Sequence, residues 1–159
     1  MKMDKILYAA HLALNTSKPF REVMEIAKKF DAKLVILHVI EELTPGAVSM
    51  AQWVGGDKIT DQHYEKYRKY STERIDAMIK ECCEKEFPDD PDCAKRIERV
   101  VVVIGYPADE ILKKLDELDC DALIIGTNSK PGIANAFLGS VAERVLRRIR
   151  KPAIVIPTA

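Results

Sequence analysis

Residues 121–157, DALIIGTNSKPGIANAFLGSVAERVLRRIRKPAIVIP, indicate the fold class of this chain. Two short apolar runs at 122–125 and 153–156 are expected to be buried strands. The loop between them carries glycine and leads into a helix that opens at Gly139 and Ser140. The first N–H groups of a helix lack intrahelical partners, and the helix dipole adds about half a positive charge there. The stretch therefore predicts an anion-binding site, suited to phosphate, within an α/β domain.

The rest of the chain alternates between strand and helix signals. The expected strands are residues 5–10, 33–40, 99–104, 122–125 and 153–156, and the expected helices are residues 17–30, 61–86, 108–118 and 140–150. Residues 41–58 are expected to form a loop. Strict alternation predicts an α/β fold: a single-domain, open, five-stranded parallel sheet of order 3-2-1-4-5, Rossmann-like, with helices on both faces.

Helical spacing also predicts which side chains face the core. In the two longest helices these are Phe20, Val23, Met24, Ala27, Phe30, Tyr64, Tyr67, Ile75, Met78 and Ile79. The apolar groups of the 41–58 loop have two expected roles that the sequence leaves open: they cover a ligand, or they pack against a second copy of the chain.

The expected strand order places a change of winding direction between the first and fourth strands. Ligands of open α/β sheets bind at the carboxyl ends of the strands that flank such a point. The residues expected there are Ala9, Ala10 and His11 after the first strand, and Gly126 to Ser129 after the fourth. The loop that ends at Gly139 is long enough to reach the same place.

Composition limits the classes of partner. The 159 residues correspond to one domain, taken as residues 1–159, by the usual prior of roughly 100–200 residues per domain. Lys plus Arg equals Asp plus Glu at 25 each, so no overall field attracts nucleic acid or an anionic membrane. The apolar runs fall short of the ~20 residues that span a bilayer. We expect a soluble, cytoplasmic protein that binds neither nucleic acid nor membrane.

The four cysteines are Cys82, Cys83, Cys93 and Cys120. Their spacing lacks the Cys-x-x-Cys pattern of zinc or redox sites, and neighbours such as Cys82 and Cys83 do not readily pair. We interpret all four as reduced thiols. A disulfide between Cys83 and Cys93, across the loop at 87–92, is the less favoured alternative because nothing in the sequence indicates an oxidising compartment.

Several nucleotide-dependent classes are disfavoured by local sequence. The P-loop pattern G-x-x-x-x-G-K-[ST] is absent, and the first strand-to-helix turn, HLALNTS at 11–17, contains no glycine. That turn also lacks the signature loops of adenylate-forming or nucleotidyl-transfer enzymes. No nucleophile, base and orienting acid can be assigned together, and no metal-ligand cluster is visible. We expect a binding protein and not an enzyme, with slow hydrolysis of a bound nucleotide left open.

Four segments, in order, carry a family resemblance that extends over essentially the whole chain. They are KILYA at 5–9, LVILHVIE at 34–41, GYPADEIL at 105–112, and GTNS at 126–129 followed by FLGSVAERVLRRIRKPAIVIP at 137–157. Together they strongly resemble the universal stress protein (UspA) family. The resemblance implies an open parallel five-stranded sheet, a homodimer formed through the last strand from Ala153 to Ile156, and a role in the stress response.

One branch of that family binds ATP with a loop of pattern G-x-x-G-x9-G-[ST]. In this chain Gly126, Gly139 and Ser140 match the pattern, but its second glycine is replaced by Ser129. A Cβ there costs of order 1 kcal/mol or more if the backbone needs a positive φ, although the hydroxyl can donate to a phosphate. His11 stands where ATP-binding members carry an aspartate, and an imidazole does not reproduce two anionic acceptor atoms.

The resemblance and the expected topology together imply an adenine nucleotide, ATP or AMP, with Mg²⁺ as a candidate companion ion. The expected nucleotide-binding residues are Ala9, His11 and Val39 on the base and ribose side, Ile125, Gly126 and Ser129 beside the phosphates, and Gly139, Ser140 and Val141 as phosphate donors. The alternative is a UspA-type dimeric interaction module that binds no nucleotide. No catalytic or metal-binding residues are assigned.

Other polar residues have simpler interpretations. His38 lies within a buried strand run and is interpreted as a satisfied histidine of the core or strand end, and His63 as an exposed residue of a charged helix. The basic residues near the end of the last helix are interpreted as complements of its dipole. These are Arg144, Arg147, Arg148, Arg150 and Lys151.

Overall fold

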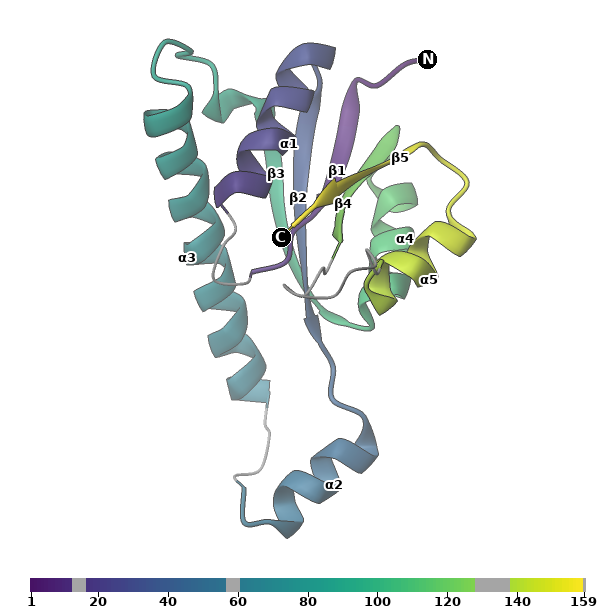
Figure 1. Ribbon diagram of the computed structural model, residues 1–159. Coiled ribbons are helices and arrows are strands. Elements are labelled where there is room, and N and C mark those ends of the chain that lie inside the picture. Colours follow the sequence, from purple (N-terminus) through teal and green to yellow (C-terminus); the bar gives the residue numbers. More distant parts are fainter. Residues whose placement is uncertain (13–16, 57–60, 128–137, 159) are drawn as a thin grey trace.

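A five-stranded parallel sheet of order β3-β2-β1-β4-β5 forms the centre of the computed structural model, which describes residues 1–12, 17–56, 61–127 and 138–158 (Figure 1). The strands are β1 (Lys5–Ala9), β2 (Lys33–Glu41), β3 (Ile97–Gly105), β4 (Ala122–Thr127) and β5 (Ala153–Pro157). The helices are α1 (Ser17–Phe30), α2 (Pro45–Trp53), α3 (Asp61–Glu86), α4 (Pro107–Glu117) and α5 (Ser140–Arg148), with a short 3-10 helix, η1 (Ala94–Arg96). The predicted strand order and the parallel pairing are confirmed.

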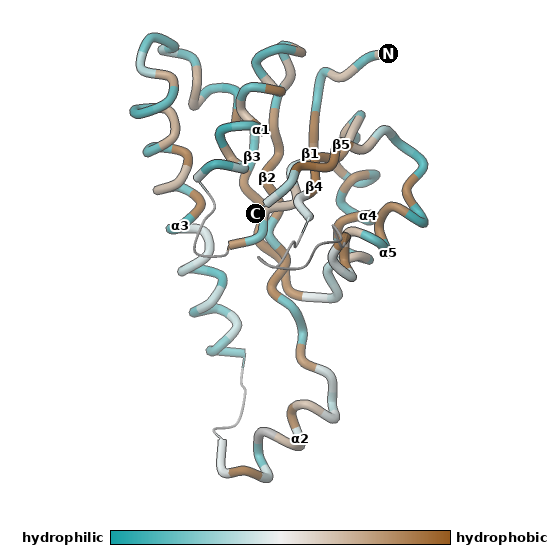
Figure 2. The backbone as a smooth tube through the Cα atoms, in the orientation of Figure 1, coloured by the Kyte–Doolittle hydropathy of each residue, from teal (hydrophilic) through white to brown (hydrophobic). Residues whose placement is uncertain are grey.

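Apolar side chains alternate between the two faces of the sheet and form two cores. On one face Ile6 and Ile36 belong to a cluster with Phe20 of α1 and Ile75 of α3. On the other face Leu7 lies in a cluster with residues of α4 and α5. Because helices cover both faces, the central strands are continuously apolar, which is why they were predictable from sequence (Figure 2).

Helix α1 buries Phe20, Val23, Met24 and Ala27 as its spacing predicts. The prediction for Phe30 is wrong, because this side chain is 49% exposed at the last residue of the helix. Phe30 therefore lies at the solvent-exposed end of α1, beyond the last buried residue of the helix, Ala27.

In α3, Ile75 is fully buried, but the core prediction for Tyr67 is wrong. Tyr67 is 58% exposed, because the first half of α3 extends beyond the layer formed by the sheet and α1 (Figure 1). Periodicity identifies the apolar face of a helix but not how far the opposing surface extends along it.

The segment expected to be a loop at 41–58 contains helix α2. Thr44 caps this helix, with its Oγ1 accepting a hydrogen bond from the Ala47 N–H at 3.2 Å, and Pro45 occupies the first turn. The helix ends before Gly55, whose φ of +83° lies in the left-handed region. The turn residues Thr44 and Pro45 were the available sequence signal for this short helix.

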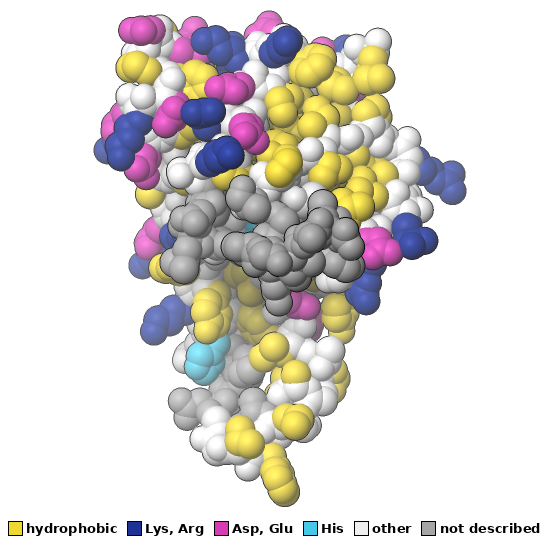
Figure 3. Space-filling view, viewed as in Figure 1, with side chains coloured by type: hydrophobic (Ala, Val, Ile, Leu, Met, Phe, Trp, Pro, Cys, Tyr) yellow, Lys and Arg dark blue, Asp and Glu magenta, His cyan; other side chains and the backbone are white. Residues whose placement is uncertain are grey.

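Helix α2 projects away from the body of the molecule, beyond the carboxyl end of β2 (Figure 1). Its Met50 and Trp53 are 72% and 91% exposed, and the following Val54 is also exposed. Figure 3 shows hydrophobic side chains gathered at this end of the molecule. In this arrangement α2 does not cover the end of β1 and β4.

The interpretation of all four cysteines as reduced thiols is wrong. Cys83 of α3 and Cys93, just before η1, form a disulfide, with their Cα atoms 5.7 Å apart. The loop between them turns back on itself and is held to α1 by the ion pair between Lys28 and Asp90 at 3.5 Å. This return brings the two cysteines together. The free thiols are Cys82 and Cys120, and burial raises the pKa of each to about 11.

We expect reduction of the Cys83–Cys93 disulfide to lower the free energy of unfolding by about 3 kcal/mol, because the bond closes a short loop and limits the unfolded chain. Urea unfolding with and without reductant measures the difference. A variant with Cys83→Ser and Cys93→Ser together should be insensitive to reductant. Thiol titration in denaturant without reductant should count Cys82 and Cys120 alone, and a count of four would contradict the disulfide.

Within the described ranges, no helix combines the length and the apolar character needed to cross a bilayer.

Candidate functional site

The carboxyl edge of the sheet has a step at β1. Ala9, the last residue of β1, lies between Leu37 of β2 and Ile125 of β4 in the strand register. Both neighbours continue beyond this level, β2 to Glu41 and β4 to Thr127. The end of the shorter central strand β1 marks the change of winding direction at the position predicted from sequence.

Helix α5 begins beside this edge with its N-terminus uncapped by a side chain. Gly139 is the N-cap residue, and the first intrahelical bond runs from the Glu143 N–H to the Gly139 carbonyl at 3.0 Å. The N–H groups of Ser140, Val141 and Ala142 therefore precede the first bond of the helix. Such groups, at the positive end of a helix dipole, favour an anionic ligand.

Gly139 does not owe its identity to backbone strain. Its φ of −52° and ψ of 158° are accessible to any L-residue. Glycine adds no side chain of its own at the start of α5. Backbone conformation therefore does not explain a glycine at this position.

The space for a side chain at position 126 is limited by the protein itself. Gly126 pairs with Ile156 of β5, and a Cβ added to Gly126 would collide with the side-chain methyl group of Thr158. The tail that follows β5 therefore passes close to the end of β4. A side chain at 126 would therefore require the Thr158 side chain to move, whether or not a phosphate binds nearby.

The apolar residues predicted to line the site lie together. Ile125 is 4% exposed and buried in the core between the sheet and α4 and α5, and Ala9, Val39 and Val141 pack against the same cluster. The Ile125 side chain therefore belongs to the core and is not available to a ligand at the edge of the sheet. Ser129 lies outside the described residues.

The residues that follow β1 form hydrogen bonds with other elements on both sides of His11. The His11 side chain itself is exposed. The His38 ring Nδ1 lies 2.9 Å from the Ala10 carbonyl oxygen, and Arg74 Nη1 donates to the Leu12 carbonyl at 3.2 Å. A carbonyl only accepts, so His38 Nδ1 carries the proton. Sequence reasoning assigned no role to Arg74, because a contact across 62 positions leaves no local pattern.

The environment of His38 favours its neutral form. Burial lowers the pKa of His38, and the nearby His11 and Arg74 lower it further, against the opposing effect of the hydrogen bond to Ala10. A neutral imidazole with Nδ1–H satisfies the Ala10 carbonyl without placing a charge in the core. This supports the interpretation of His38 as a satisfied histidine at the strand end.

Three of the basic residues around the end of α5 have polar partners, two of them in neighbouring elements. Arg148 pairs with Asp109 of α4 at 2.6 Å, and Arg147 pairs with Glu143 within α5 at 2.8 Å. Lys151 donates to carbonyl oxygens at the end of α4 and just beyond it. The prediction that these cations complement the α5 dipole is wrong for Lys151, which complements the carboxyl end of α4.

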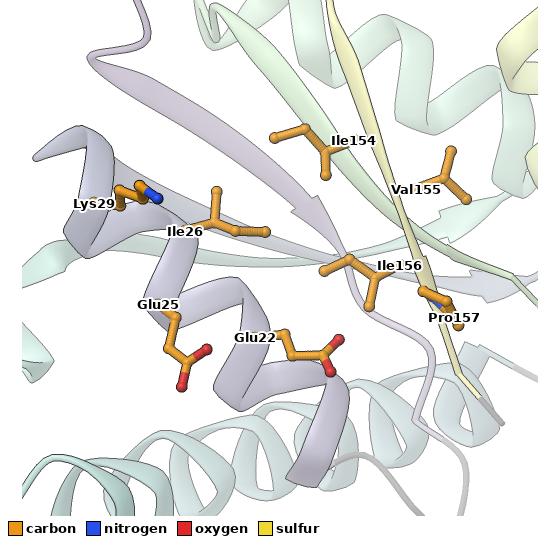
Figure 4. Close-up of a pocket in the computed structure, with 8 residues that line it drawn as sticks. All are labelled: Glu22, Glu25, Ile26, Lys29, Ile154, Val155, Ile156 and Pro157. Atoms are coloured by element: carbon orange, nitrogen blue, oxygen red, sulfur yellow. The ribbon is translucent and has the colours of Figure 1, made fainter.

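An open groove of about 410 Å³ lies between α1 and the edge strand β5 (Figure 4). It is separate from the carboxyl ends of β1 and β4. Ile26 of α1 faces Ile154 and Ile156, and Glu22, Glu25 and Lys29 form the polar rim. Val155 points to the other side of the strand. This groove follows an unpaired strand edge and is mainly apolar at its base.

In the described part of the chain, no three His, Cys, Asp or Glu side chains are grouped to hold a metal ion.

Comparison with known proteins agrees with this architecture. The chain is similar to the universal stress protein MJ0577 of Methanocaldococcus jannaschii, with 23% identity over 152 residues, 96% of this chain and 93% of that protein. The solved structure of MJ0577 matches with a TM-score of 0.69 and 21% identity, covering 100% of this chain and 99% of that one.

Two solved universal stress proteins of this fold are nucleotide complexes. One, in complex with cAMP, matches with a TM-score of 0.57 and 21% identity over 100% of both chains. The other, from Archaeoglobus fulgidus in complex with dAMP, matches with a TM-score of 0.54 and 18% identity over 97% of both chains. The family model described as "Universal stress protein family" matches residues 2–157. The chain therefore belongs to the universal stress protein family.

Proposed function

We propose that this protein binds an adenine nucleotide, ATP or AMP, at the carboxyl edge of β1 and β4, and that occupancy of the site serves a stress response. The observation that carries the proposal is the start of α5. There the N–H groups of Ser140, Val141 and Ala142 precede the first helical bond, behind a glycine that adds no side chain. Phosphate is the ligand group that this arrangement suits.

The proposed roles combine the position of this edge with the sequence motif of the ATP-binding branch of the family. Ala9, His11 and Val39 contact the base and ribose, Ile125, Gly126 and Ser129 lie beside the phosphates, and Gly139, Ser140 and Val141 direct backbone and hydroxyl donors at them. The cAMP and dAMP complexes of other family members support adenine as the base. Mg²⁺ would accompany ATP through the phosphate oxygens. We propose binding and not catalysis as the function of the site.

The test is to release small molecules from the purified protein by denaturation, identify them by mass spectrometry, and titrate the emptied protein with ATP and AMP by calorimetry, with and without Mg²⁺. Co-purified nucleotide or micromolar affinity would show that Ser129 and His11 are tolerated in a working site. Absence of both would overturn the proposal and favour the dimeric interaction module that acts through protein contacts alone.

We also propose a homodimer formed through β5. This strand is the edge of the sheet and carries unpaired backbone groups along one side, with Val155 39% exposed. An apolar edge of this kind can pair with its symmetry mate about a two-fold axis. The groove between α1 and β5 adds an apolar surface along the same edge.

Replacement of Val155 by aspartate is expected to shift the protein from dimer to monomer at micromolar concentration, because the two-fold axis would bring the new carboxylates close together in a desolvated contact. Sedimentation equilibrium measures the mass directly. Val54→Asp is the matched control, since Val54 is exposed on the distant α2 end and should leave the dimer intact. Dissociation by Val54→Asp with a persistent Val155→Asp dimer would assign the interface to α2 instead.

A further inference from the structure

Ala10, the first residue after β1, forms hydrogen bonds to β2 through both its N–H and its carbonyl group. The Ala10 N–H donates to the Leu37 carbonyl at 2.8 Å, and the Ala10 carbonyl accepts from His38 Nδ1 at 2.9 Å. Leu37 and His38 are consecutive residues of β2. The strand pairing of β1 is thus extended by one residue, with a side chain supplying the second bond.

Two residues further on, the backbone is held from a different element. Arg74 of α3 donates to the Leu12 carbonyl at 3.2 Å. Its guanidinium lies 5.8 Å from the ring centroid of Tyr70, one helical turn earlier, which limits where the guanidinium can go. The carbonyls on either side of His11 are therefore each bound by a side chain, one from β2 and one from α3.

We propose that His38 and Arg74 are positioning residues for the nucleotide site, which hold the backbone at His11 so that residues 9–11 meet the base and ribose in one conformation. The inference rests on the nucleotide binding proposed above. His11 itself is exposed and lies where the chain leaves the sheet, a place where backbone is ordinarily mobile. Binding to a segment already ordered loses less conformational entropy than binding to a mobile one.

The two residues act through the backbone and not through the ligand. His38 lies partly buried on β2, with Nδ1 already directed at the Ala10 carbonyl, and Arg74 reaches the same segment from α3. The chemistry they supply is donation of N–H to a carbonyl. A side chain that retains an N–H in the same place should therefore retain the effect, and one of similar size without it should not.

The experiment compares His38→Leu with His38→Asn, whose side-chain amide retains an N–H near the position of Nδ1. Hydrogen exchange of the Ala10 amide is the first readout and needs no ligand. We expect His38→Leu to raise this exchange rate about tenfold and His38→Asn to restore it to within about twofold of the wild type. The amide of Ile124, within the central sheet, reports whether overall stability has changed.

The second readout is ATP affinity by calorimetry. We expect His38→Leu to weaken binding about fivefold to tenfold, with His38→Asn again close to the wild type. Arg74→Met should act in the same direction. Arg68→Met is its control on the same helix, because Arg68 pairs with Glu65 on the exposed surface.

The outcomes separate this inference from the proposal on which it rests. If the wild type binds ATP and His38→Leu binds equally well, or if Ala10 exchange is unchanged, the positioning role is overturned and the nucleotide site stands. If the wild type binds no adenine nucleotide, the proposed function fails and the ligand-positioning role fails with it. Faster exchange together with weaker binding, both reversed by asparagine, supports the inference.

Discussion

Replacement of Phe20 by alanine is expected to lower the free energy of unfolding by about 3–5 kcal/mol, a large part of the stability of a domain this size. Phe20 is fully buried between α1 and the sheet, and its ring centroid lies 6.1 Å from that of Tyr8 in β1. Truncation removes apolar contacts on both elements and leaves a cavity that neither a rigid strand nor a packed helix can fill. Urea unfolding followed by circular dichroism measures the change.

The same helix offers a matched control in Phe30, which is the same residue type but 49% exposed. Phe30→Ala should cost about 1 kcal/mol or less. Equal losses from the two substitutions would contradict the assignment of Phe20 to the core. They would also indicate that α1 does not pack on the sheet as described.

Replacement of Gly139 by tryptophan is expected to weaken ATP binding by at least about 100-fold, because a large side chain would occupy the space in front of the α5 N–H groups. The fold should survive, since the φ of −52° at Gly139 is accessible to tryptophan. Calorimetric titration with ATP and Mg²⁺ measures the affinity, and circular dichroism verifies the fold.

Gly46→Trp is the control for this experiment. Gly46 lies in α2, where an added Cβ would meet nothing within 4 Å, so the substitution should leave affinity unchanged. If Gly139→Trp binds ATP as well as the wild type does, the phosphates do not sit at the start of α5. Gly126→Ala is a poorer test, since its collision with Thr158 would disturb the protein without any ligand.

The inner strands of the sheet were predictable because they are buried on both faces. KLVILHVI at 33–40 forms the inner strand β2, as a continuous apolar run predicts. RVVVVI at 99–104 also forms a strand, β3, but this strand is an edge of the sheet and is only partly buried. The bounds of α1 and α3 were likewise predicted, since amphipathic spacing and turn residues mark them. Helix α2 was missed because its short sequence, PGAVSMAQW, lacks an apolar face that alternates with a polar one.

For the candidate site, the sequence predicted the carboxyl edge of β1 and β4 and the start of α5. It did not predict the hydrogen bonds that His38 and Arg74 make to the backbone after β1. Gly139 and Ser140 are recognisable from local sequence because a helix begins there. The contacts of His38 with Ala10 and of Arg74 with Leu12 join elements far apart in the chain. Nothing in the neighbouring sequence of either side chain indicates its partner.

The sequence by itself determined the class of fold and the strand order, because these follow from local burial patterns and from the chirality of strand connections. Only the tertiary structure decided that Cys83 meets Cys93, that Phe30 and Tyr67 face solvent, and that Gly126 lies against Thr158. Each of these depends on the distance between segments remote in the chain, and that distance is set by packing of whole elements.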